Sequence, residues 1–239
     1  SNFGTSLVER ALIHAVCRAR RATLTEALRE NLLGAYLGAL QPVLRGVAPR
    51  DYLPANPPAE IFARHTVGLS DPITAGELAA GERVDDGLPQ TLDEVIRFYG
   101  QRHFKIKING EPARDLDRLG RIAAVLAAEC RGGDFAFSLD GNESFHDVPS
   151  FADHFRQLQM EPALRALWPH LLYVEQPWHR SVALSPAIGE LAQAWPDRPP
   201  IIIDESDTEL ASLPTALALG YAGTSHKNCK GVFKSVVNA

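Results

Sequence analysis

The chain has 239 residues, of which 45% are hydrophobic and 22% charged, and its formal net charge is −5. This length suits one α/β domain of about 200–250 residues. The negative charge and the absence of a basic tract argue against nucleic acid as a partner. No apolar run approaches the roughly 18–20 residues that cross a bilayer, and the N-terminus lacks the layout of a signal peptide. We therefore expect a cytoplasmic protein with no membrane or nucleic-acid partner.

The first 58 residues are predicted to form a helical segment followed by a connector. Ser6 and Glu9 make a capping-box pattern, and apolar residues then recur at helical spacing through Ala19. A second helical stretch is expected at about residues 23–33. Five prolines within residues 42–58 indicate the connector. Residues 59–239 are then expected to form the main domain.

From residue 61 onward, short apolar runs alternate with helical patterns. Predicted strands cover residues 61–69, 104–108, 135–140, 171–175 and 201–204, and a last segment of this kind is 220–227. Predicted helices cover residues 91–102, 114–131 and 210–219, with helical segments up to 168 and a helix starting at Ser185-Pro186. This alternation predicts right-handed βαβ units and a parallel sheet.

Charged residues lie at or near the carboxyl ends of consecutive predicted strands. They are Lys107, Asp140, Glu175, Asp204 and Lys227. In a (β/α)₈ barrel, the carboxyl ends of all strands meet at one mouth, where the active site is built. An open doubly wound sheet usually carries a glycine-rich first turn instead, and neither GxGxxG nor GxxxxGK[ST] is present. The sequence therefore predicts an α/β fold of the TIM-barrel type, incomplete at about six strands.

The predicted strand 104–108 carries two of these cationic residues. Period-two alternation places Lys105 and Lys107 on one face and three apolar residues on the other. A surface strand with solvated lysines is the ordinary interpretation of such a pattern. The acids that end the next three strands favour a site instead.

Three carboxylates at one mouth would repel one another without a counter-charge. A hard divalent cation removes this repulsion, and oxygen ligands favour Mg²⁺, or Mn²⁺, over zinc. We therefore predict Asp140, Glu175 and Asp204 as ligands, with Asn142 and Glu205 as their supporting partners. Lysines on either side of a substrate could then remove and return a proton, if their pKa values are lowered.

Five short motifs occur in order along the chain. They are Lys105-Ile-Lys107, Asp140-Gly-Asn142, Val174-Glu175-Gln-Pro177, Ile203-Asp204-Glu205-Ser206 and Lys227-Asn-Cys-Lys230-Gly231. Together they resemble the enolase superfamily, specifically its muconate-lactonizing-type subgroup, the mandelate racemase/muconate lactonizing enzyme family. The resemblance covers about residues 60–235, and the predicted helices at 6–33 are similar to those preceding the barrel in that family.

The resemblance implies abstraction of the α-proton of a small carboxylate substrate, with Mg²⁺ stabilising the enolate. Racemases or epimerases, cycloisomerases and dehydratases share this step. Lys107 and Lys227 would be opposing acid/base groups, with Lys105 assisting, and the three acids would bind Mg²⁺. Family members also have a capping sheet and two further strands, so we expect this chain to be a piece of a longer protein or to be completed by another chain. We also expect a homo-oligomer.

Two other functions fit the same residues. A barrel aldolase would use one of the lysines as a Schiff-base nucleophile. A non-catalytic enolase-like barrel would bind metal weakly and turn over no substrate.

Overall fold

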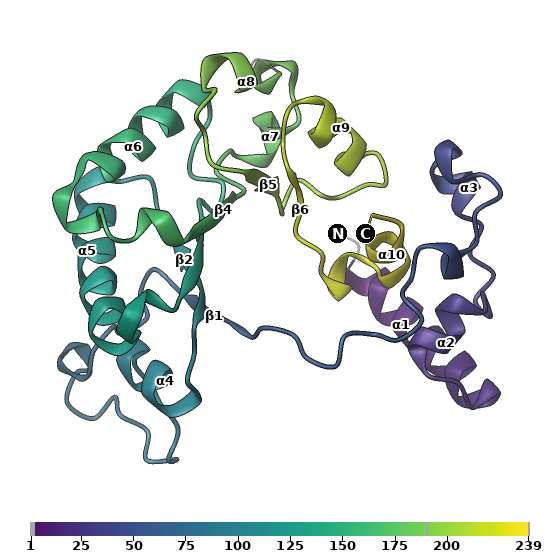
Figure 1. Cartoon of the computed structure of the whole chain (residues 1–239), viewed down its shortest axis with the longest axis horizontal. Coiled ribbons are helices and arrows are strands. Elements are labelled where there is room, and N and C mark those ends of the chain that lie inside the picture. Colours follow the sequence, from purple (N-terminus) through teal and green to yellow (C-terminus); the bar gives the residue numbers. More distant parts are fainter. Residues whose placement is uncertain (1–2, 190, 239) are drawn as a thin grey trace. The chain divides into compact units, whose positions relative to one another are not determined.

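The computed structural model describes residues 3–189 and 191–238 (Figure 1). Contacts divide the chain into two compact units. The first unit contains Ser1–Ile61, Asp207–Leu213 and Thr224–Ala239, and the second contains Phe62–Ser206 and Pro214–Gly223. Among the described residues, none of the helices combines the length and the apolar character that crossing a membrane requires.

The second unit is built on a parallel sheet whose strands follow chain order. The strands are β1 (Arg64–Val67), β2 (His103–Lys107), β3 (Ala136–Asp140), β4 (Leu171–Glu175), β5 (Ile201–Ile203) and β6 (Gly223–Thr224), adjacent in that sequence. The pairings from β1 to β5 are all parallel. A barrel wall has this sequential order, whereas a doubly wound sheet reverses its order at a switch point. The predicted α/β class, with a sheet of six strands in chain order, is thus confirmed.

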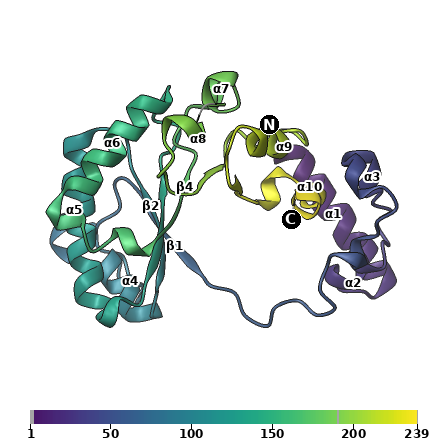
Figure 2. The same ribbon diagram turned by 45° about the horizontal axis from the view of Figure 1, so that its top comes forward.

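Helices cover one face of this sheet. Figures 1 and 2 show α4 (Leu92–Tyr99), α5 (Pro112–Glu129) and α6 (Val148–Met160) on the same side of the strands. The shorter helices α7 (Arg180–Ala183) and α8 (Leu191–Ala194) come between β4 and β5 in the chain, and α9 (Ser212–Ala218) comes between β5 and β6. Each helix therefore connects neighbouring parallel strands, as βαβ units require.

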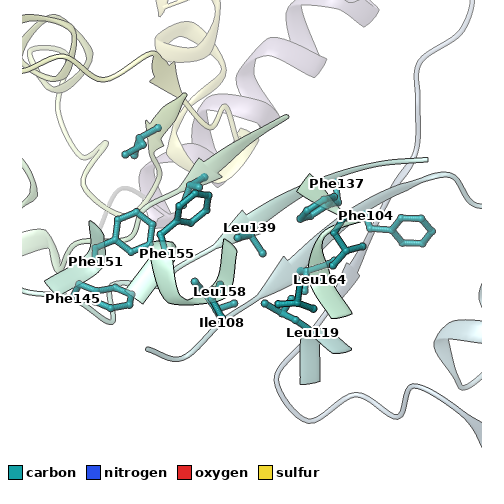
Figure 3. Packing of buried hydrophobic residues seen from close by; sticks show 14 of the residues in the cluster. Phe104, Ile108, Leu119, Phe137, Leu139, Phe145, Phe151, Phe155, Leu158 and Leu164 are labelled. Atoms are coloured by element: carbon teal, nitrogen blue, oxygen red, sulfur yellow. The ribbon is translucent and has the colours of Figure 1, made fainter. Parts of the chain in front are cut away.

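Alternate strand residues form a hydrophobic core with these helices. Figure 3 shows this packing, which includes Phe104 and Ile108 around β2, Phe137 and Leu139 from β3, Leu119 from α5, and Phe151, Phe155 and Leu158 from α6. Burying each such side chain contributes about 1.5–3 kcal/mol before entropy is subtracted. The residues between them in the strands, including Lys105 and Lys107, point to the opposite face. This second face, with Arg64, Lys105, Lys107, Ser138, Asp140, Tyr173 and Glu175, is called the inner face below.

Helix α4 begins after Thr91, whose hydroxyl donates to the side chain of Asp93 and does not cap the helix backbone. Glu94 instead accepts from the backbone N–H of Gln90 at 3.0 Å. The helix ends at Tyr99 rather than at residue 102, because Gly100 adopts a left-handed φ of 64°.

The first unit is helical, with a small core of its own. It contains α1 (Phe3–Arg20), α2 (Leu24–Arg29), α3 (Leu37–Leu40) and α10 (Val232–Asn238). The capping box expected at Ser6 is wrong, since this residue lies inside α1. A capping box does form at Thr23 and Glu26, at the start of α2.

The C-terminal segment packs against the N-terminal helix. The carboxylate of Glu9 in α1 accepts from the backbone N–H groups of Val232 and Phe233, at 2.7 and 3.1 Å. A carboxylate in this position satisfies free donors at the start of α10 and matches its dipole. The sequence pattern did not indicate this pairing of the two ends.

Candidate functional site

The carboxyl ends of β2, β3, β4 and β5 are aligned by their pairing. Lys107 is opposite Asp140, Asp140 is opposite Glu175, and Glu175 is opposite Ile202. Lys105 precedes Lys107 by two residues and therefore shares its face. The parallel register thus gathers two predicted lysines and two predicted metal ligands on one part of the inner face.

Lys105 lies between the two carboxylates. Its Nζ is 2.9 Å from Asp140 Oδ2 and 2.7 Å from Glu175 Oε1. Burial alone would lower the pKa of Lys105, but its hydrogen bonds to Glu175 and Asp140 outweigh burial and raise that pKa above its ordinary value. Lys105 is therefore a fixed positive charge at neutral pH and a poor proton acceptor.

Glu175 carries a negative charge that the protein only partly balances. The side chain is 0% exposed, and its Oε2 atom has no hydrogen-bond partner in the described part of the chain. Burial and the hydrogen bond with Asp204 raise the pKa of Glu175, while Lys105 opposes this rise. Arg64 approaches Oε2 only to 3.8 Å. This carboxylate is therefore suited to a further cation.

The donor set fits a hard divalent cation in its chemistry. Asp140 and Glu175 already share one cation, and Asp204 is hydrogen-bonded to Glu175. Buried carboxylate oxygens of this kind are the ligands that Mg²⁺ prefers. Within residues 3–189 and 191–238, however, no three His, Cys, Asp or Glu side chains are arranged to hold an ion. The common partner of Asp140 and Glu175 is the ammonium of Lys105, which lies between the two carboxylates.

Asn142 connects the predicted base to a predicted ligand. Its Oδ1 accepts from Lys107 Nζ at 2.6 Å, and its backbone N–H donates to Asp140 Oδ1 at 2.9 Å. Lys107 is partly buried and has this neutral amide as its partner, in contrast to the two carboxylates around Lys105. Glu205 is partly buried in the segment after β5, next to Asp204.

Lys227 belongs to the other compact unit. It follows β6 and precedes the 3₁₀ turn Asn228–Lys230. Because Lys107 lies in the second unit and Lys227 in the first, the proposed opposition of the two lysines stays a prediction.

Arg64 is an inner-face cation that the sequence analysis did not assign. It donates to Ser138 Oγ at 3.1 Å and to the hydroxyl of Tyr173, and its guanidinium lies 3.8 Å from Glu175 Oε2. In the structure Thr66 pairs with Lys105, so Arg64, two residues before Thr66, lies on the inner face. The sequence signal for Arg64 was this two-residue spacing within a predicted strand.

Gln176 holds the segment that carries Asp204. Its Oε1 accepts from the backbone N–H groups of Asp204 and Ser206, at 2.7 and 3.2 Å. Its Nε2 donates to Trp178 O and to Ser206 Oγ, both at 2.7 Å. The side chain is 1% exposed, so these bonds form out of water. Gln176 therefore fixes the backbone of Asp204 beside Glu175, a role that the motif alone did not reveal.

We expect Gln176→Ala to lower the free energy of unfolding by about 2–3 kcal/mol, because it leaves buried backbone donors without acceptors. Gln157→Ala, on the exposed surface of α6, is the matched control and should change stability little. Urea unfolding of both variants measures the difference. Equal stability of the two variants would show that Gln176 does not support this segment.

The loops after β3 and β4 are bound closely together. The backbone N–H of Glu143 donates to Gln176 O at 2.9 Å, and that of Phe145 donates to Pro177 O at 3.0 Å. Asn142, Glu143 and Gln176 have φ values of 46°, 64° and 38°, which non-glycine residues seldom adopt. Such backbone strain concentrates at functional sites.

Gly141 permits the close approach of these loops, since a Cβ there would lie 2.5 Å from Pro177 Cα. We expect Gly141→Ala to destabilise the protein by about 1–3 kcal/mol through this overlap. Gly120→Ala in α5 meets no atom within 4 Å and should instead stabilise the helix, by about 1 kcal/mol. Denaturant titration gives both values, and a neutral Gly141→Ala would mean that the loops separate easily.

No protein-family model and no curated protein matches this chain. Several solved structures are similar to it. An N-succinyl Arg/Lys racemase from Bacillus cereus ATCC 14579 is 18% identical with a TM-score of 0.45, over 58% of this chain and 33% of that chain. A mandelate racemase/muconate lactonizing enzyme from Bordetella bronchiseptica RB50 is 24% identical with a TM-score of 0.42, over 58% and 34%.

A third similar structure is a putative mandelate racemase/muconate lactonizing enzyme from Roseovarius nubinhibens ISM, complexed with magnesium. It is 19% identical with a TM-score of 0.46, over 84% of this chain and 47% of that chain. This chain thus spans about a third to a half of the length of these structures. In each of the three alignments the identity is below 25% and the TM-score is below 0.5.

Proposed function

We propose that this chain carries the metal and proton-transfer site of an enzyme that abstracts the α-proton of a small carboxylate substrate. The reaction would proceed through an enolate and end in racemisation or epimerisation, cycloisomerisation or elimination. The observation that supports this proposal is the inner-face cluster. In it two buried carboxylates contact the ammonium of Lys105, and a second lysine, Lys107, lies two residues further along the same strand as Lys105.

In this proposal Asp140, Glu175 and Asp204 hold Mg²⁺ or Mn²⁺. A bound divalent cation would supply positive charge where the substrate carboxylate gains negative charge as the α-proton leaves. Asn142 and Glu205 would keep the ligands oriented. Without such charge, removing a proton next to a carboxylate is too costly for a side-chain base at neutral pH.

Lys107 is the stronger candidate for the base on this side of the site. Its ammonium donates to the neutral oxygen of Asn142 at 2.6 Å, whereas that of Lys105 is held by two carboxylates. Lys105, whose pKa is raised by two carboxylates, is the positively charged helper. Lys227 is proposed to return or remove the proton from the opposite side of the substrate.

A Schiff-base aldolase is the second candidate function, but the contacts of Lys105 count against that residue as its nucleophile. An amine nucleophile must be neutral, whereas Asp140 and Glu175 stabilise the protonated form. Borohydride treatment with carbonyl substrates would trap an adduct on Lys107 or Lys227 only if the aldolase reaction occurs.

The proposed function is tested by isotope exchange. The protein is incubated in D₂O with Mg²⁺ and a panel of N-acyl amino acids, dipeptides and acid sugars, and the α-proton signal of each substrate is followed by NMR. The proposal predicts loss of that signal for at least one compound, and retention of the signal after EDTA treatment. Exchange that persists without divalent cations, or no exchange with any compound despite measured Mg²⁺ binding, would contradict it.

A further inference from the structure

Lys105 contacts one oxygen of each of two carboxylates that the proposed function assigns to a metal ion. Its ammonium contacts Asp140 Oδ2 and Glu175 Oε1 at 2.9 and 2.7 Å. Mg²⁺ in oxygen sites requires ligand distances of about 2.1 Å and strict octahedral geometry. A lysine ammonium and a divalent cation cannot both occupy the small space between the same two oxygens.

We propose that Lys105 is the internal counter-ion of the metal-free site, and that a divalent cation binds by displacing its ammonium from Asp140 and Glu175. The inference rests on the proposed function for the identity of the ligands. It adds an antagonism between one lysine of this chain and the metal.

Charge balance explains why such a counter-ion is needed. Asp140 and Glu175 are 3% and 0% exposed at their side chains, and two buried carboxylates without a cation would be strongly unfavourable. Lys105 supplies one positive charge, and Arg64 adds a weaker contribution at 3.8 Å. In this proposal the metal competes with Lys105 for the two carboxylates.

Displacement also changes what Lys105 can do next. Once the metal neutralises the two acids, the ammonium is released on the inner face and can meet another anion. Metal binding should thus favour binding of a carboxylate substrate, and by linkage the substrate should favour metal binding. The expected order is metal first and carboxylate second.

The direct test is Mn²⁺ affinity measured by electron paramagnetic resonance. Lys105→Met should bind Mn²⁺ at least about tenfold more tightly than the wild type, because the competing charge in contact with the ligands is gone. Lys107→Met is the matched control, since it removes the same charge from the same face. The lysine that it replaces donates to Asn142 rather than to an acid. Its Mn²⁺ affinity should stay within about threefold of the wild type, as expected for a partly exposed charge that is hydrogen-bonded to a neutral amide.

A second measurement uses the wild-type protein, so that it does not depend on the folding of a variant. Amine acylation read by mass spectrometry should leave Lys105 largely unmodified in EDTA, because the residue is 8% exposed and ion-paired. Mg²⁺ alone should raise its modification rate severalfold.

The outcomes separate this inference from the proposed function. Equal Mn²⁺ affinities for Lys105→Met and Lys107→Met, or a Lys105 modification rate that Mg²⁺ leaves unchanged, would overturn the counter-ion role while α-proton exchange could still occur. Tighter Mn²⁺ binding by Lys105→Met without any α-proton exchange by the wild type would uphold the counter-ion role and contradict the proposed activity. No Mn²⁺ binding by any of the three proteins would overturn the antagonism.

Discussion

Replacing Lys107 with alanine is expected to slow α-proton exchange by about 10²–10⁴-fold, the usual contribution of a positioned general base. We expect this change to leave the proposed metal ligands in place, because the hydrogen bond of Lys107 is to the Asn142 side chain. Mn²⁺ affinity should therefore remain close to that of the wild type. NMR exchange rates and Mn²⁺ titration on the same samples give the two values.

Lys107→Arg is the matched control for this experiment. Arginine keeps the positive charge and can still donate to Asn142, but it stays protonated and cannot act as a base. It should lose exchange to the same extent as Lys107→Ala. An arginine variant that retained exchange within about tenfold of the wild type would show that Lys107 acts only through its charge.

Replacing Glu175 with glutamine is expected to weaken Mn²⁺ binding by at least about 100-fold, since outer partners of metal ligands alone typically account for about 10–100-fold. The substitution keeps the shape of a fully buried side chain and removes its negative charge. It also leaves Lys105 with Asp140 as its remaining carboxylate partner. Mn²⁺ titration measures the effect directly.

Glu143→Gln is the comparison for Glu175→Gln. Glu143 follows β3 and binds Arg180 through an ion pair at 2.6 Å, so it has its own cation. That pairing lowers the pKa of Glu143, in contrast to the raised pKa of Glu175. Mn²⁺ affinity should change by no more than about twofold in Glu143→Gln, because a paired charge outside the cluster is screened. A comparable loss of Mn²⁺ affinity in both variants would mean that the net charge of the protein, and not the position of Glu175, determines the affinity.

Much of the second unit could be predicted from two features of the sequence: the alternation of apolar and polar residues within strands, and the charged residues at strand ends. The alternation in β2 separates Phe104 and Ile106 from Lys105 and Lys107, and burial of the apolar pair follows from it. Asp140 ends β3 and Glu175 ends β4, so a parallel register is enough to place the two acids side by side. The structure pairs Asp140 with Glu175.

The contacts of individual side chains could not be predicted in the same way. Lys105 spans β3 to reach Glu175 on β4, and strand spacing alone does not choose between this contact and a solvated lysine. Gln176 is similar: its four bonds depend on a left-handed backbone after β4, which no residue type in this segment requires. Long-range packing of α10 on α1 likewise depends on Glu9, whose pattern indicated a local helix cap.

In a crystal grown with Mn²⁺, we expect an anomalous-difference peak at about 2.1 Å from carboxylate oxygens of Asp140, Glu175 and Asp204, with the ammonium of Lys105 moved away from both of its present partners. A map in which Lys105 still joins Asp140 and Glu175 at saturating Mn²⁺, and the ion lies elsewhere or is absent, would contradict it.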